Sequence, residues 1–74
     1  MGKSIYSTEY DFVLRQLKRA RIEAGMTQAE VAKRIGKPQS YISKCESSER
    51  RLDVIELIQL AKLYKKPLSF FVNE

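Results

Sequence analysis

The sequence predicts a compact all-α domain of five short helices, and three observations support this fold class. Apolar residues recur three and four positions apart over most of the chain, which is the spacing of one face of a helix. Capping signals, glycine and proline then divide the chain into short segments. No stretch shows the alternation of apolar and polar residues that is typical of a strand. The chain has 74 residues, so we expect one domain over residues 8–74, preceded by a flexible arm over residues 1–7.

The composition limits how so small a domain can be stabilised. Cys45 is the only cysteine and the chain has no histidine, so neither an internal disulfide nor a zinc site is expected. We expect Cys45 to be a small core residue rather than a redox sensor. Without a histidine or a carboxylate pair in an apparent cleft, no nucleophile can be matched with a base, so we expect no enzymatic activity and no cofactor.

Membrane and secretion signals are missing from the sequence. No run of about eighteen apolar residues is present, as a membrane-spanning helix requires. No apolar signal-peptide core follows Met1. The sequence therefore predicts a soluble, cytoplasmic protein, and we expect no membrane as its main partner.

Positive charge is concentrated in the middle of the chain. The net charge is +5, but residues 15–51 hold ten Lys and Arg against four acidic residues. A solvated surface can be basic without a partner, but a basic block of this kind is better explained by a polyanion. Nucleic acid is the leading partner class, and an anionic membrane surface comes second.

Start and stop signals define the first two predicted helices. The first helix starts near Thr8, with Asp11 completing a weak capping box, and it ends at Gly25. The second covers residues 28–35, because Thr27 and Glu30 form a stronger capping box. Gly36 then stops this helix.

Three further helices follow. A third helix is expected from Pro38 to about Glu46, because proline suits the first turn of a helix. A capping box of Asp53 with Glu56 starts the fourth, which ends near residue 64, and a short fifth helix covers about residues 68–72. The residues expected to face the core in the third helix are Pro38, Tyr41, Ile42 and Cys45, and those in the fourth include Val54 or Ile55, Leu57, Ile58, Leu60, Ala61 and Tyr64.

The opposite face of the third helix carries the candidate functional site. Two short helices joined across Gly36 are typical of a helix-turn-helix. Amide, hydroxyl and ammonium groups can hydrogen-bond base edges, whereas a face made only for solubility usually mixes Glu with Lys. We therefore expect this helix to lie in the major groove of double-stranded DNA. The expected base-reading residues are Gln39, Ser40, Ser43 and Lys44.

A resemblance to a known family rests on two neighbouring segments. Residues 21–32 read RIEAGMTQAEVA and residues 36–46 read GKPQSYISKCE. Both segments are similar to the phage repressor and Cro family, whose members are regulators of the xenobiotic-response-element-like type, and the similarity runs from about Leu14 to Phe71. It implies a lambda-repressor-like fold with a central helix-turn-helix.

The resemblance also implies roles for individual residues. Gln28 would bond a phosphate and brace Gln39, while Arg21 and Glu46 would form a partly buried ion pair. Ser48 stands where the family often has glycine, so the loop after the third helix is expected to be strained or differently shaped. The expected phosphate-binding residues are Gln28, Lys37, Tyr41, Arg50 and Arg51.

Two functions from different classes remain open. The first is a homodimeric transcriptional regulator, most simply a repressor, that binds an inverted-repeat operator. The alternative is a DNA-binding antitoxin or a restriction-control protein whose main partner is another protein. The candidate dimer-interface residues are Leu68, Phe70 and Phe71.

Overall fold

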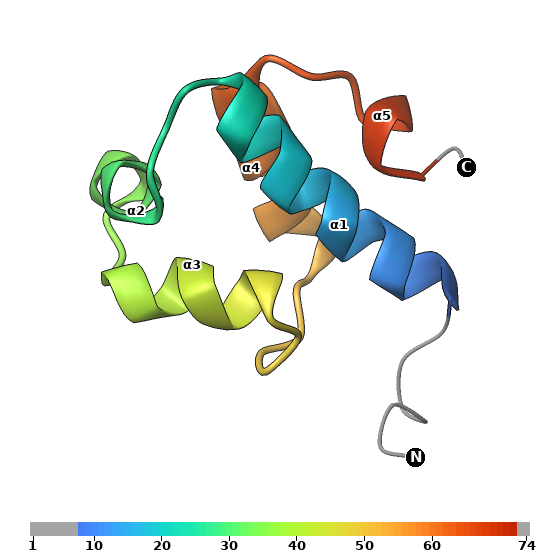
Figure 1. Cartoon of the computed structure of the whole chain (residues 1–74), viewed down its shortest axis with the longest axis horizontal. Helices are drawn as coiled ribbons and strands as arrows, with labels where there is room; N and C mark the ends of the chain where they lie inside the picture. The colour runs from blue at the N-terminus through green and yellow to red at the C-terminus, as the bar shows by residue number, and fades with distance from the viewer. Residues whose placement is uncertain (1–7, 73–74) are drawn as a thin grey trace.

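Five helices make up the fold of residues 8–72, the part of the chain that the computed structural model describes. They are α1 (Thr8–Glu23), α2 (Gln28–Ile35), α3 (Gln39–Glu46), α4 (Val54–Tyr64) and α5 (Ser69–Val72) (Figure 1). No strand occurs within these residues. The predicted all-α class with five helices is confirmed, and the expected arm over residues 1–7 lies outside the described residues.

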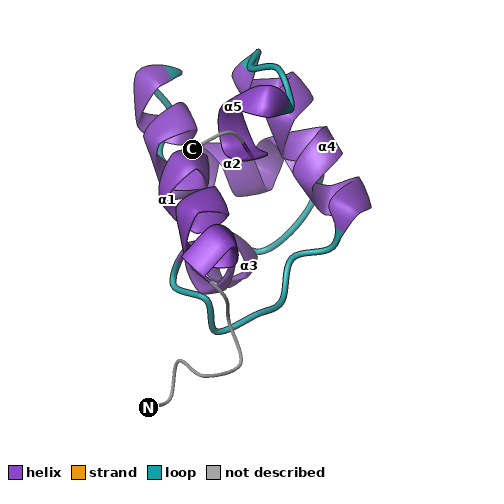
Figure 2. Ribbon diagram, turned by 90° about the vertical axis from the view of Figure 1, so that its right-hand side faces the viewer, coloured by secondary structure: helices purple, strands orange, loops and turns teal. Residues whose placement is uncertain are grey.

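Helix α1 is the central element of the fold. It contacts α3, α4 and α5, and α2 packs on α3. Figure 2 shows α3 at one end of the molecule, with the long loop that leads from α3 to α4 running along that end. All four of the longer helices and α5 contribute to one core, whose buried residues are Leu17, Ala20, Val31, Ala32, Ile42, Leu57, Leu60, Ala61, Tyr64 and Phe71.

Helix α2 has the ends that its sequence predicts. The Glu30 backbone N–H donates to the Thr27 hydroxyl over 3.1 Å, and the Thr27 N–H donates to the Glu30 carboxylate over 2.8 Å. Gly36 ends the helix at φ +73°, in the left-handed conformation that glycine adopts without a Cβ penalty. Helix α2 is therefore fixed at both ends, and a short turn leads from it to α3.

The expectation that Pro38 packs into the core is wrong. Pro38 is the residue before α3, in an extended conformation with ψ 156°, and it is exposed. The cap residue does not have helical backbone angles, so its side chain does not lie in line with the apolar face of α3. Thr8 likewise is the first helical residue of α1, so it cannot be the cap of the expected box with Asp11.

Helix α4 begins at the predicted capping box but is rotated differently from the expectation. Asp53 accepts a hydrogen bond of 2.8 Å from the Glu56 N–H. Val54 and Ile55 are both 60% exposed, so neither packs into the core as expected. The apolar residues of this segment surround much of the helix, and Leu57, Leu60, Ala61 and Tyr64 define the buried side instead.

The loop after α3 contains a backbone conformation that is unfavourable for its residue. Ser48 has φ +64°, in the region that residues with a Cβ rarely adopt. This agrees with the strain expected where the family often has glycine. Lys65, at the end of α4, adopts a similar φ of +58°.

Candidate nucleic-acid interface

The outer face of α3 is polar and accessible. Gln39, Ser40 and Lys44 are exposed, and Ser43 is half-buried. On the opposite side Ile42 and Cys45 are almost completely buried. The helix is therefore held by its apolar side and presents the four residues that were expected to read bases.

The groups on this face differ in how far they are already bonded. The Ser43 hydroxyl donates to the Ser40 carbonyl oxygen over 3.3 Å, within the helix. Neither the Gln39 amide nor the Lys44 ammonium makes a side-chain hydrogen bond to another of the described residues. These two long side chains keep their donors for a partner, and the Ser43 oxygen can still accept.

A partly buried ion pair fixes α3 to α1. Arg21 Nε donates to Glu46 Oε2 over 2.8 Å, and Arg21 Nη2 donates to Glu46 Oε1 over 3.2 Å. A third bond, of 3.0 Å, joins Arg21 Nη1 to the Met26 carbonyl oxygen. The Arg21 side chain is only 12% exposed, so the pair that the resemblance implied is present, and this arginine is committed to the structure. The same bonds to Glu46 raise the pKa of Arg21 above its ordinary value.

Gln28 belongs to the same cluster, which corrects one expectation. Its amide nitrogen donates to Glu46 Oε1 over 3.1 Å, so it does not brace Gln39 as expected. Both glutamines line one shallow depression at the start of α2 and α3, together with Thr27 and Ala29. Glu46 is the nearest strong acceptor, and a carboxylate takes the donor in preference to a neutral amide.

The hydroxyl of Tyr64 lies in the interior without a hydrogen-bond partner. It is the one such buried side-chain atom among residues 8–72. Burial raises the pKa of Tyr64, and the negative charge of Glu46 raises it further. No sequence pattern signals this group, because helical spacing alone identifies Tyr64 only as a core residue.

Arg50 and Tyr41, which were both expected to bind phosphate, are joined to each other in this structure. The Arg50 guanidinium carbon lies 4.5 Å from the centroid of the Tyr41 ring. Arg50 also forms two hydrogen bonds of 2.9 Å to the Glu56 carboxylate. An internal carboxylate thus compensates the charge of Arg50, so this arginine is not a free cation in the folded protein.

Glu56 was overlooked by the sequence reasoning, which assigned it only to a helix cap. Arg50 lowers the pKa of this carboxyl to about 2. Burial and the neighbouring Glu56 carboxylate raise the pKa of the Tyr41 hydroxyl. The pairing of residues 50 and 56 crosses a loop, so no helical spacing could have indicated it.

The two other basic candidates also lie over aromatic rings. Lys37 Nζ is 5.3 Å from the centroid of Tyr41. The Arg51 guanidinium carbon is 5.6 Å from the centroid of Tyr10, whose hydroxyl accepts a 2.9 Å bond from the Leu52 N–H. Both cations remain exposed at the surface, next to the turn and the loop that flank α3.

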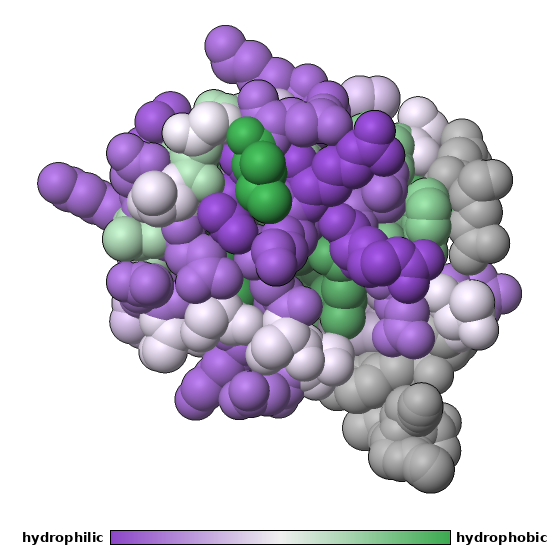
Figure 3. All heavy atoms as spheres, in the orientation of Figure 1, coloured by the Kyte–Doolittle hydropathy of each residue, from purple (hydrophilic) through white to green (hydrophobic). Residues whose placement is uncertain are grey.

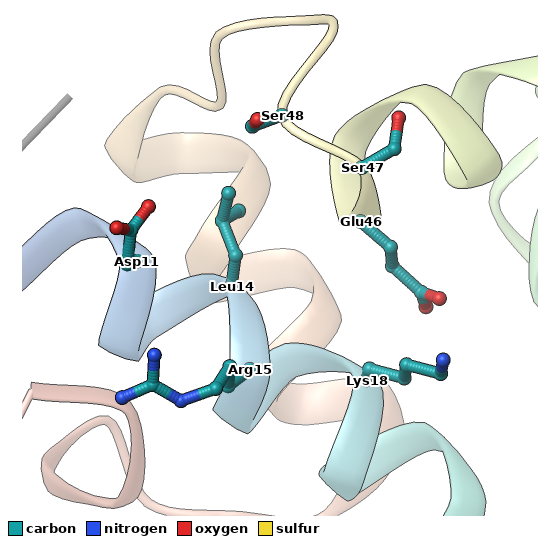
Figure 4. A pocket seen from close by; sticks show the side chains of 7 residues that line it. All are labelled: Asp11, Leu14, Arg15, Lys18, Glu46, Ser47 and Ser48. Atoms are coloured by element: carbon teal, nitrogen blue, oxygen red, sulfur yellow. The ribbon is translucent and has the colours of Figure 1, made fainter. Parts of the chain in front are cut away.

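A small hollow between α1 and the end of α3 is a weaker candidate site. Figure 4 shows side chains of opposite charge around it: Arg15 and Lys18 are basic, and Asp11 and Glu46 are acidic. Glu46 is already bound by Arg21 and Gln28. The charges around this hollow compensate one another, so it has no preference for a charged ligand.

The candidate dimer residues divide into two groups. Phe71 is completely buried in the core, so its assignment to an interface is wrong. Phe70 is half-buried and stacks edge-on against Phe71, with Lys66 Nζ 4.6 Å above its ring. Leu68 is 42% exposed, and α5 also exposes Val72, which the sequence reasoning did not select. Figure 3 shows that the face in view is mostly hydrophilic, with hydrophobic side chains only in small separate patches.

The comparison with protein families agrees with this architecture. A family whose description is helix-turn-helix matches residues 17–71, about three quarters of the chain. The chain therefore belongs to the helix-turn-helix family of the Cro and repressor type, as the resemblance of its sequence predicted. It is a DNA-binding regulator of this class. The comparison with curated proteins gave no match.

None of the helices within residues 8–72 has the length and apolar content needed to span a membrane.

Proposed function

We propose that this protein is a sequence-specific transcriptional repressor that binds an inverted-repeat operator as a homodimer, with α3 as its recognition helix in the major groove. One observation carries the proposal: the exposed face of α3 presents Gln39, Ser40 and Lys44, while Ile42 and Cys45 anchor the opposite face. This face has no carboxylate that phosphates would repel. In this proposal the dimer acts in the cytoplasm, and its binding to a promoter is the simplest route to repression.

Base reading in this proposal is divided among four side chains. Gln39 can give a donor and an acceptor to the N6 and N7 atoms of adenine. Lys44 can reach guanine acceptors, and Ser40 and Ser43 make shorter contacts. The Arg21–Glu46 pair holds the end of α3, so the helix that carries these groups needs little rearrangement on binding.

Phosphate binding in this proposal comes from the residues beside α3. Lys37 and Arg51 supply charge at the turn and the loop, and Tyr41 contributes through its ring edge and hydroxyl. Gln28 keeps a second amide hydrogen for a phosphate, since only one of its bonds is formed with Glu46. These contacts give most of the affinity and a steep salt dependence, with a log–log slope of about −0.9 per phosphate neutralised.

The first prediction tests base reading at Gln39. The DNA duplex is obtained by selection from a random pool with the wild-type protein. Gln39→Ala should weaken binding to this duplex by about 1–3 kcal/mol, and should leave binding to a scrambled duplex nearly unchanged. Fluorescence anisotropy titrations measure both affinities. Gln59→Ala, which truncates an exposed glutamine on α4, is the matched control and should change neither; equal losses on both duplexes for Gln39→Ala contradict the assigned role.

The homodimer is tested by the mass of the complex on the same selected duplex. Two copies related by a two-fold axis place their recognition helices about 34 Å apart, one turn of DNA. We expect a palindromic selected sequence that binds two chains, with Leu68 and Phe70 near the contact between them. A single chain bound to an asymmetric sequence contradicts this part of the proposal.

A second candidate function is supported by exposed apolar side chains. Ile22, Val54 and Ile55 are each about 60% exposed, and burial of such side chains against a protein partner would remove apolar surface from water. In this alternative the protein is an antitoxin or a restriction-control protein whose main partner is another protein. A partner that co-purifies, together with weak and salt-insensitive DNA binding, would favour it.

A further inference from the structure

We propose that Glu56 is a positioning residue for DNA recognition, which holds Arg50 on the ring of Tyr41 and thereby fixes α3 relative to the start of α4. This inference rests on the proposed function, because it takes α3 as the helix that reads DNA. It assigns a role in sequence discrimination to a residue outside the polar face of α3.

The contacts of Glu56 reach both the loop and the start of its own helix. Arg50 Nη1 donates to Glu56 Oε1, and Arg50 Nη2 donates to Oε2, each over 2.9 Å. Two parallel bonds between a guanidinium and a carboxylate fix both position and orientation. The Asp53 N–H donates to Oε1 over 3.1 Å. Glu56 is therefore held by the cap of α4 while it holds Arg50.

The second link joins Arg50 to the recognition helix. The guanidinium lies 4.5 Å from the centre of the half-buried Tyr41 ring, and an arginine stacked on an aromatic ring gains both cation–π and packing energy. Helix α3 packs mainly on α2 and α1. The series Glu56, Arg50 and Tyr41 thus adds a connection from α4 to the first turn of α3, one turn from Lys44.

Charge gives the same arrangement a second consequence. The Arg50 side chain is 39% exposed, so without Glu56 it would be an additional free cation beside the reading face. A free cation binds phosphates of any sequence, which strengthens binding to random DNA as well as to the operator. By compensating this charge, Glu56 lowers non-specific binding, while the fixed position of Tyr41 supports specific binding. Both effects raise the ratio of specific to random affinity.

Glu56→Gln separates these effects from the stability of α4. Glutamine also completes a capping box, so the helix start is kept while the negative charge is lost. Affinities are measured on the duplex selected by the wild-type protein and on a scrambled duplex of the same length and composition. We expect the ratio of the two affinities to fall roughly tenfold, within the range of coupling energies for residues of one network. On the scrambled duplex, binding should tighten and the salt slope should steepen by about 0.9, one additional phosphate contact.

Two control variants isolate the role of Arg50. Glu30→Gln makes the same substitution in the capping box of α2, where the carboxylate bonds the Thr27 N–H over 2.8 Å and pairs with no described arginine. Its affinity ratio should remain within about twofold of the wild type, below the coupling range of one network. In an Arg50→Gln background, Glu56→Gln should leave the salt slope unchanged, because no released guanidinium is present.

The outcomes distinguish this inference from the proposed function. A wild-type protein that selects no sequence overturns the proposed function, and the inference with it. A selective wild type whose ratio and salt slope are unchanged by Glu56→Gln overturns the inference alone. If Glu56→Gln does not fold, Arg50→Lys decides, since it keeps the charge but loses the two-armed pair. A reduced ratio for Arg50→Lys supports the inference, and an unchanged ratio overturns it.

Discussion

At the scale of single residues, the buried side-chain polar atoms of residues 8–72 all have a hydrogen-bond partner except one hydroxyl near Glu46. Glu46 accepts bonds from Arg21 and Gln28 and so compensates the charge of an arginine that is 12% exposed. Tyr64 lies near the same charges, but its hydroxyl has no partner among the described residues. Burial of an unsatisfied polar group opposes folding, whereas the ring itself contributes to the core.

Tyr64→Phe should therefore stabilise the fold. The substitution removes the unpaired oxygen and keeps the ring, so we expect the free energy of unfolding to rise by about 1 kcal/mol. Urea denaturation followed by circular dichroism measures this change. Tyr10→Phe is the control, because its hydroxyl accepts a 2.9 Å bond from the Leu52 N–H, and this variant should lose stability. A loss of similar size in both variants would show that Tyr64 has an essential partner.

At the scale of helices and loops, local signals account for what could be predicted. The capping boxes at Thr27 and Asp53 are formed as expected, because their partners lie only three residues away. The exposed face of α3 follows from helical spacing once Ile42 and Cys45 are assigned to the core. Short-range physics therefore determined the number of helices, most of their ends and the polar face.

Interactions between distant segments explain what could not be predicted. The pairing of Arg50 with Glu56 depends on the path of a loop, and the choice of Gln28 for Glu46 depends on how α2 and α3 meet. The rotation of α4, which exposes Val54 and Ile55, is set by packing on α1, since apolar residues surround this part of the helix. The charge state of the Arg50 surroundings could not be predicted for the same reason, because a basic residue in a sequence carries no sign of an internal acidic partner.

Two backbone positions offer a test at this scale. Ser48 and Lys65 have φ +64° and +58°, and a left-handed conformation costs a residue with a Cβ about 1–2 kcal/mol. Ser48→Gly and Lys65→Gly should each raise the free energy of unfolding by about 0.5–1 kcal/mol, after the entropy that glycine adds to the unfolded chain. Gly36→Ala should have the opposite effect, because Gly36 has φ +73° and a Cβ there would meet no atom within 4 Å, so only backbone strain is added. Thermal unfolding of the three variants measures the changes, and a destabilised Ser48→Gly contradicts the assignment of strain to this loop.

At the scale of the whole molecule, a small core is combined with a strongly basic surface. The chain holds 14 Lys and Arg against nine acidic residues, and several of those acids lie in ion pairs that join different segments. Glu46 connects α3 to α1, Glu56 connects α4 to the loop before it, and Glu23 connects α1 to Lys66. The acidic residues thus act mainly within the protein, and the excess positive charge is left for a polyanionic partner.

This distribution predicts how stability depends on pH. Arg50 lowers the pKa of Glu56 to about 2 in the folded protein, while an unperturbed glutamate has a pKa of about 4.3. Between these values the unfolded chain binds a proton that the folded protein does not, so stability rises with pH in this window. The contribution of Glu56 is therefore complete above pH 5 and is lost as the pH falls towards 2. Lys66 and Arg19 lower the pKa of Glu23 in the same direction.

Comparison of the wild type with Glu56→Gln isolates this contribution. At pH 7 we expect the wild type to be more stable by about 1–2 kcal/mol, a value reduced for the partial exposure of Arg50 to solvent. The difference should shrink through pH 4 and be mostly lost near pH 2, where Glu56 is about half protonated and both proteins also unfold more easily from the repulsion of their positive charges. Urea midpoints at closely spaced pH values measure the difference, and Glu30→Gln provides the control for loss of one carboxylate. A difference that stays constant from pH 7 to pH 2 would show that the bond between Arg50 and Glu56 does not stabilise the folded state through its charge.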